Sequence, residues 1–209
     1  EYRYVVPKGF TRLLGKLSEL TDRGIPVHFF GGNHDIWTYR YLHDECGVTL
    51  YHSPYAEFEL DGRKVIVGHG DMLGPRPAGQ RILSAIFRSR LLQWLFSMLH
   101  PYWAMMLGKG WSRSNRTSRP VAHVFRGEEE PIIGFAHEYQ RTHPSATADL
   151  FICGHTHCAE VYPLPEGGAV AFLGEWIDNP LYGVLGPDGF ELKGYPDRAV
   201  IGKSGTTRQ

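Results

Sequence analysis

The sequence has few cysteines and no spacing that would pair them. Cys46, Cys153 and Cys158 are the only three in 209 residues, and no two have C-x-x-C spacing. An odd number without such spacing favours free thiols in a reducing compartment and argues against a disulfide framework. The N-terminus also lacks a basic patch followed by an apolar stretch, so we see no signal or transit peptide. We therefore expect a cytoplasmic protein.

Acidic residues are missing from the middle of the chain. Overall, 22 Lys and Arg residues balance 22 Asp and Glu residues, yet residues 75–126 hold eight arginines, Lys109 and no acidic residue. This segment carries +9, and the rest of the chain carries 13 minus 22, or −9. With 42% hydrophobic residues the chain is too apolar to be disordered, and its length supports a core without disulfide staples.

Hydrophobic periodicity predicts an α/β fold. Leucines at helical spacing predict a helix over residues 10–20, and the apolar run 27–30 predicts a buried strand that opens into the loop 31–35. A second helix is predicted over residues 36–46, closed by Gly47. A helix followed directly by a strand favours α/β architecture.

The remaining core is predicted to be mainly strands. Residues 55–60 and 64–67 flank the turn 61–63 as a hairpin. Further strands are predicted at 149–153, 161, 169–173, 181–185 and 190–193. After Asp197 the pattern predicts a loose tail.

Three predicted strands end in a similar pattern of glycine and histidine. Their loops are GGNHD at 31–35, GHGD at 68–71 and GHTH at 154–157. Ligands of open α/β sheets bind beyond the carboxyl ends of strands, and imidazole and amide groups suit a divalent transition metal. One histidine of the eleven alone would most often be an ordinary surface residue. Three such loops together predict a metal site.

These motifs resemble the later motifs of the calcineurin-like metallophosphoesterases, and GHTH is the most specific. The resemblance implies mixed β-sheets flanked by helices and two divalent metal ions, with Mn²⁺ expected and Fe or Zn as alternatives. It implies that Asn33, His69 and His155 ligate one ion and that His157 ligates the other. His34 would lie near the phosphoryl oxygens or the leaving group, to stabilise charge or donate a proton.

The first two motifs of that family, Asp-x-His and Gly-Asp-x-x-Asp, do not occur in this sequence. No aspartate has a histidine two residues later, and Gly74 stands where Gly70-Asp71 would need an aspartate. An ion held by His157 alone would have too few protein ligands. Because only 32 residues precede Asn33, we expect the missing motifs to lie upstream of Glu1 and the 209-residue chain alone to be inactive.

Residues 91–108, LLQWLFSMLHPYWAMMLG, form an uncharged run with basic residues on both sides. Its length permits a membrane span, but its polar residues and its place between two halves of one catalytic core argue against one. Two interpretations remain open, and the absence of acidic residues favours the second. The first is a cap whose packed face is Leu91, Trp94, Leu95, Met98 and Tyr102. The second is an interfacial helical hairpin, with Trp and Leu among acyl chains and arginines at the headgroups.

The run that follows is rich in donors for phosphate oxygens. Lys109, Arg113, Asn115 and Arg116 are therefore candidate substrate-binding residues that could grip a diphosphate. Arginines among aromatics also fit nucleic acid, but the density of Leu and Met is unlike a single-strand stacking groove. We expect no nucleic-acid partner.

A basic, apolar helical insertion lies between the GHGD and GHTH motifs, the fourth and fifth of the family. It is similar to the insertion of the UDP-2,3-diacylglucosamine diphosphatases of lipid A synthesis. The resemblance implies hydrolysis of a lipid-linked nucleotide diphosphate to UMP and 2,3-diacylglucosamine 1-phosphate, with manganese, on the inner face of the cytoplasmic membrane. One position departs from the pattern, because many members have arginine after the motif asparagine where this sequence has His34.

The expected organisation is a metallophosphoesterase core of residues 1–74 and 127–197, a helical insertion of residues 75–126, and a tail of residues 198–209. Two alternative functions stay open. One is a soluble phosphodiesterase or phosphatase whose insertion is only a cap, and the other is a catalytically inactive lipid-binding fragment.

Overall fold

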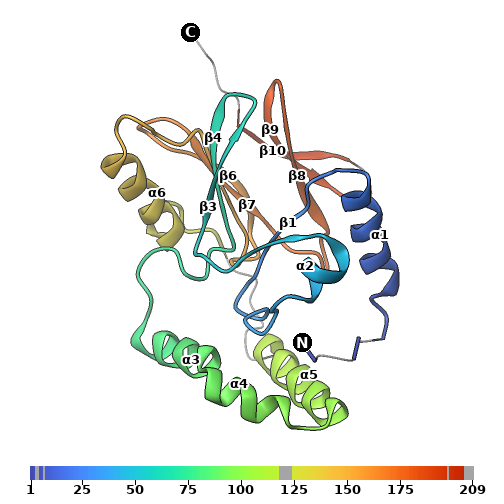
Figure 1. Ribbon diagram of the computed structural model, residues 1–209. Helices are drawn as coiled ribbons and strands as arrows, with labels where there is room; N and C mark the ends of the chain where they lie inside the picture. Colours follow the sequence, from blue (N-terminus) through green and yellow to red (C-terminus); the bar gives the residue numbers. More distant parts are fainter. Residues whose placement is uncertain (3–4, 7, 118–123, 197, 205–209) are drawn as a thin grey trace. The chain divides into compact units, whose positions relative to one another are not determined.

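The computed structural model describes residues 1–2, 5–6, 8–117, 124–196 and 198–204 (Figure 1). The chain forms two compact units. Unit 1 comprises Glu1–His52 and Arg76–Val121, and unit 2 comprises Ser53–Pro75 and Ala122–Gln209. Each unit is described by itself.

Unit 2 is built on a five-stranded sheet with the order β3-β4-β5-β7-β6. Its strands are β3 (Ala56–Leu60), β4 (Arg63–Gly68), β5 (Leu150–Cys153), β6 (Ala159–Pro163) and β7 (Ala169–Leu173). The three central strands β4, β5 and β7 are parallel, whereas β3 and β6 pair antiparallel at the edges. The carboxyl ends of the central strands therefore share one edge of the sheet.

A second sheet and one long helix complete unit 2. The sheet is antiparallel with the order β10-β9-β8, and the helix α6 follows a short 3-10 turn, η1. Their bounds are β8 (Leu181–Gly186), β9 (Gly189–Gly194), β10 (Val200–Ser204), η1 (Gly127–Glu129) and α6 (Pro131–Thr142). The hairpin and the strands from 149 to 194 match the predicted positions.

The five-stranded sheet is covered on both faces because successive residues of its strands point to opposite sides. On β5, Phe151 packs in a cluster with Ile133 and Ala136 of α6, all fully buried. Its neighbour Leu150 packs on the other face in a cluster with Phe190 of β9. The core of unit 2 thus has three layers: the helix α6, the five-stranded sheet and the second sheet. This is the mixed α/β class that the sequence predicts.

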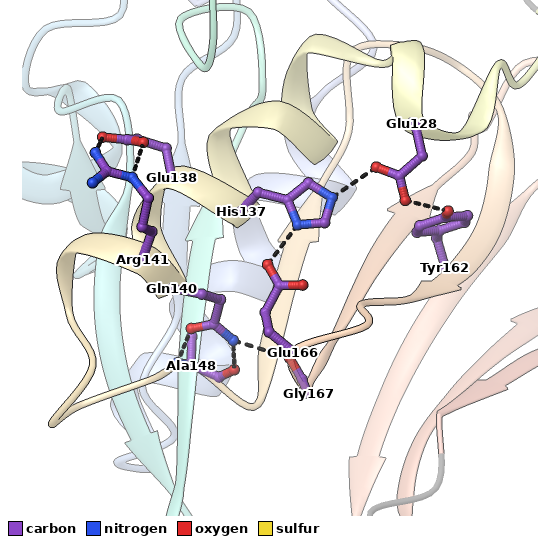
Figure 2. A network of polar contacts seen from close by, with 9 residues as sticks. All are labelled: Glu128, His137, Glu138, Gln140, Arg141, Ala148, Tyr162, Glu166 and Gly167. Atoms are coloured by element: carbon purple, nitrogen blue, oxygen red, sulfur yellow. Dashed lines mark hydrogen bonds and ion pairs between the residues drawn. The ribbon is translucent and has the colours of Figure 1, made fainter.

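The buried amide of Gln140 joins α6 to the loop before β5 and to the turn between β6 and β7 (Figure 2). Its Nε2 donates to the carbonyl oxygens of Ala148, at 2.7 Å, and Gly167, at 3.0 Å. Its Oε1 accepts the Ala148 N–H at 2.8 Å. A buried amide with every partner in place fixes local geometry without a desolvation penalty.

Unit 1 contains five helices and a two-stranded parallel sheet among the described residues. Its elements are α1 (Thr11–Asp22), β1 (His28–Phe30), α2 (Tyr41–Cys46), β2 (Thr49–Tyr51), α3 (Ala78–Arg88), α4 (Arg90–Ser97) and α5 (Pro101–Thr117). The Trp37 ring contacts Phe87 and Phe96, and its Nε1 donates to the Phe87 carbonyl at 2.8 Å. The segment after β1 is thereby anchored to α3 and α4.

Helices α3, α4 and α5 leave many apolar side chains exposed. Leu91, Trp94, Leu95, Met98 and Tyr102 are between 48% and 68% exposed. They therefore do not form the packed face that one interpretation of this segment requires. In the described part of the chain, every helix falls short of the length and apolar character needed to cross a membrane.

Two predicted boundaries differ from the structure. The helix predicted over residues 36–46 begins only at Tyr41, because Trp37 turns into the aromatic contact with α3 and α4 and the Glu1 carboxylate accepts the Tyr39 N–H. The tail predicted to be loose contains β10, which pairs with β9 and contacts Val161 through Gly202. The run Val200–Ser204 is short and interrupted by Gly202, so it gives no clear local strand signal.

Candidate metal centre

The histidine loops of unit 2 meet where β4 and β5 end side by side. The parallel ladder pairs Gly68 with Cys153, and it continues one step further because the Gly154 N–H donates to the His69 carbonyl at 3.0 Å. The rings of His69 and His155 lie edge to face with centroids 5.4 Å apart. The structure thus brings two of the predicted ligands together.

Glycine is required at one of the two positions beside the histidines. Gly70 has a φ of +110°, and a Cβ there would lie 2.9 Å from Ile132 Cδ1 and 3.3 Å from His155 Cβ. Backbone strain and crowding therefore exclude other residues at Gly70. At Gly154, a Cβ would lie 3.8 Å from His69 Nδ1, which is an ordinary contact distance.

The GHTH loop holds two non-glycine residues in the left-handed region. His155 has a φ of 67° and His157 a φ of 60°, and both side chains are exposed. Between them, Thr156 donates its N–H to the Gly154 carbonyl at 2.8 Å and places its hydroxyl 3.0 Å from Cys158 Sγ. Such conformations cost energy, and they cluster at functional sites.

The pair of rings fits one metal ion. Two imidazoles that ligate an ion through bonds of about 2.1 Å at a tetrahedral angle have ring centres about 5 Å apart. The 5.4 Å between His69 and His155 agrees with that separation. Across the described residues, no three His, Cys, Asp or Glu side chains form a group that could hold a metal ion, so the role of the pair as ligands stays a prediction.

A third loop at the same edge of the unit 2 sheet follows β7. Gly174 has a φ of +73°, and the carboxylate of Glu175 accepts the backbone N–H groups of Ile177, Asp178 and Asn179. These bonds, led by the one from Asn179, lower the pKa of Glu175, and the nearby charge of His157 lowers it further. An apolar strand followed by Gly-Glu repeats the pattern of the histidine loops, which is the sequence signal that could have identified Glu175.

The N-terminus of α6 packs against these loops. A Cβ on Gly74 would lie 2.3 Å from the Pro131 carbonyl oxygen, and Ile132 approaches Gly70. The buried Glu130 carboxylate accepts the Arg126 N–H at 3.1 Å and lies 3.6 Å from Arg126 Nε. Nothing in the spacing of the sequence pointed to this pair, which secures the chain just before α6.

The buried thiols beside the loops are unreactive by their environment. All three cysteines are free, and burial raises the pKa of Cys153 to about 12. Burial also raises the pKa of Cys158, which is half-buried. A thiol whose pKa is raised by burial is a poor nucleophile at neutral pH, so the chemistry of this edge belongs to the histidines.

The remaining predicted site residues lie in unit 1. Asn33 and His34 occupy an exposed turn after β1, in which the Asp35 carboxylate accepts the Gly32 N–H at 3.1 Å. Their joint role with the histidines of unit 2 stays a prediction. Lys109 is exposed on α5, whereas the side chains of Arg113, Asn115 and Arg116 lie outside the described residues.

In unit 2, parallel strands that end in glycine and histidine are thus covered by a helix on one face and by a second sheet on the other. No protein-family model matches the sequence. A UDP-2,3-diacylglucosamine hydrolase from Porphyromonas gingivalis is 36% identical over 197 residues, which are 88% of this chain and 74% of the relative. A protein of the same name from Hahella chejuensis is 29% identical over 185 residues, covering 85% of this chain and 71% of that protein.

The chain belongs to the UDP-2,3-diacylglucosamine hydrolase family. Among solved structures, Yfce, a phosphoesterase from E. coli, aligns with 97% of this chain and 76% of its own at 14% identity and a TM-score of 0.48. The family assignment depends on the relatives in sequence. It confirms the resemblance and the hydrolase class that the motifs predicted.

Proposed function

We propose that the protein hydrolyses the pyrophosphate bond of UDP-2,3-diacylglucosamine, with one water consumed and UMP and 2,3-diacylglucosamine 1-phosphate released. The observation that carries this proposal is the 36% identity, over 88% of the chain, to a relative named for hydrolysis of that compound. The paired histidines of unit 2 supply a place for the chemistry, and the exposed apolar helices of unit 1 supply a place for acyl chains.

In this proposal Asn33, His69 and His155 hold one ion and His157 the other, with Mn²⁺ as the metal. When bound, the ions supply Lewis-acid polarisation of the phosphoryl oxygens. The bond between the Gly154 N–H and the His69 carbonyl holds the backbones of the two histidine loops side by side. His34 donates a proton to the leaving oxygen or stabilises its charge.

The helices α3 to α5 are proposed to seat the lipid end of the substrate and to attach the protein to the inner face of the cytoplasmic membrane. Trp94 and Met98 are more than half exposed, and Arg88 and Arg90 lie at the start of the same apolar run. Apolar side chains gain by entering acyl chains, while arginines pair with phosphate headgroups. Lys109, Arg113, Asn115 and Arg116 would bind the diphosphate.

The direct test is release of UMP from UDP-2,3-diacylglucosamine with and without Mn²⁺. The protein is assayed as the 209-residue chain and as its native reading frame encodes it, with a soluble chromogenic phosphodiester as the second substrate. Manganese-dependent UMP release by the native form supports the proposal. Turnover of the phosphodiester without UMP release would contradict it and assign a soluble phosphoesterase of other specificity.

A further inference from the structure

Both ring nitrogens of His137 on α6 contact carboxylates from different elements of unit 2 (Figure 2). Nδ1 lies 2.5 Å from Glu166 Oε1, in the turn between β6 and β7, and Nε2 lies 2.7 Å from Glu128 Oε2, in η1. The other oxygen of Glu128 accepts the hydroxyl of Tyr162 on β6 at 2.6 Å. We call His137, Glu128 and Glu166 the carboxylate clamp.

The clamp depends on the charge of one imidazole. A neutral ring has a single N–H and can donate to one carboxylate only, whereas the protonated ring donates to both. The hydrogen bond to Glu166, and then that to Glu128, raise the pKa of His137 above its ordinary 6.5. The contribution of the clamp to stability is therefore complete below pH 6.5 and is lost as the pH rises through the raised value.

The other charged groups around the clamp are already paired. Glu138, next to His137 on α6, forms an ion pair with Arg141 at 2.6 Å. Glu130, at the start of α6, is held with Arg126. Glu129 on η1 is exposed. The charges that favour the protonated form of His137 are therefore those of Glu166 and Glu128 themselves.

The clamp closes on the segment by which the chain returns from the basic insertion. Glu128 follows the last basic residue of that insertion, Arg126, by two positions. Phe125 packs on the rings of Tyr162 and Phe172, and the buried Glu130 holds the Arg126 N–H. Two contacts of the return segment therefore do not involve His137. The third, at Glu128, depends on the protonation of His137.

We propose that His137 is a positioning residue that fixes the return segment, residues 124–130, and through it the binding of the acylated substrate, without a part in the hydrolytic step. Only the kinetic consequence of this inference rests on the proposed function. The closed clamp holds the segment through which the chain enters unit 2 after the helical insertion. Opening of the clamp lowers affinity for a substrate that needs the insertion and leaves a small phosphodiester unaffected.

The structural test is hydrogen exchange of residues 124–130 between pH 6 and pH 9, corrected for the intrinsic rate, with the pKa of His137 followed by NMR. In the wild type, we expect a pKa above 6.5 and exchange that quickens several-fold above it. His137→Gln should exchange fast throughout, and His137→Arg slowly throughout, because guanidinium stays charged. Glu138→Gln is the matched control and should follow the wild type.

The kinetic test separates binding from chemistry. At pH 6, His137→Gln should raise KM for UDP-2,3-diacylglucosamine several-fold, with kcat and phosphodiester turnover unchanged, and His137→Arg should restore KM. The proposal would be overturned if neither the hydrogen exchange of residues 124–130 nor KM changed with pH or with the His137→Gln substitution. A wild type that leaves UDP-2,3-diacylglucosamine intact would instead overturn the proposed function, and the exchange result would still decide the clamp.

Discussion

The strand-based core of unit 2 and the helices α3 to α5 of unit 1 bury their apolar residues very differently. In the core, Phe151, Phe172 and Val170 are fully buried, and the two apposed histidines lie at the edge of that packed sheet. In the helices, Trp94 and Met98 are 58% and 68% exposed, and acidic residues are absent. This contrast supports the proposal, in which chemistry that needs fixed geometry is assigned to the first region and recognition of a flexible lipid to the second.

Among the predictions that test this contrast, removal of one histidine from the edge of the core sheet should cause the largest loss of activity. His155→Ala should reduce metal-dependent turnover by more than about a hundredfold, since loss even of an outer-shell partner costs 10–100-fold. Steady-state assays of UMP release measure the loss. His52→Ala, at an exposed histidine outside the motif loops, is the control and should match the wild type. Turnover by His155→Ala near the wild-type rate would remove His155 from the site.

Equivalent truncations in the two regions should have unequal effects on stability. Phe151→Ala, in the centre of the sheet, should lower the free energy of unfolding by about 3–5 kcal/mol. Trp94→Ala, at an exposed position on α4, should change it by less than about 0.5 kcal/mol. Urea denaturation followed by circular dichroism compares the two. A similar loss in both variants would show that the helices are part of the packed core.

A change confined to the helices should affect one substrate and spare the other. Trp94→Ser with Leu95→Ser should lower turnover of the acylated substrate by more than about tenfold, because burial of even one large apolar side chain is worth about 1.5–3 kcal/mol and about 1.4 kcal/mol is tenfold. Hydrolysis of a soluble phosphodiester should be unchanged. Leu60→Ser, at an exposed leucine of β3, is the matched control. Equal losses on both substrates would indicate a structural role instead.

The smallest expected effect lies in the second sheet. Bonds from Lys193 and then Lys203 lower the pKa of Glu191 to about 2. A depressed carboxyl pKa stabilises the fold above its unfolded value of 4.5, and the contribution is lost as the pH falls through about 2. An NMR titration of Glu191 should therefore show a midpoint well below 4.5, and a midpoint at 4.5 would show that the two lysines do not engage it.

Local sequence signals predicted the strands well and the long-range contacts poorly. The hairpin around Asp61-Gly62 followed from turn chemistry, and Ala169–Leu173 followed from an apolar run bounded by glycines. The strand β10, by contrast, is short and interrupted by Gly202, so no clear local signal indicated that it pairs with β9. The strand β1 lies with β2 in a separate two-stranded sheet of unit 1, which the run of apolar residues did not reveal.

The sequence likewise predicted one part of the candidate site and missed another. The meeting of His69 and His155 could be predicted because each follows a parallel strand, and parallel strands end at one edge. Glu175 could have been found from the same pattern after β7. The carboxylate clamp could not, since His137 lies 9 residues from Glu128 and 29 from Glu166, with no periodicity that relates the three.

The most direct test of the central claim is a double-mutant cycle of His69→Ala and His155→Ala, read as manganese-dependent release of UMP from UDP-2,3-diacylglucosamine. Residues that hold the same ion act as a unit, so either single substitution should remove nearly all turnover and the double variant should lose little more. Losses that multiply in the double variant would show that the two histidines act independently and would contradict a shared metal site at the end of β4 and β5.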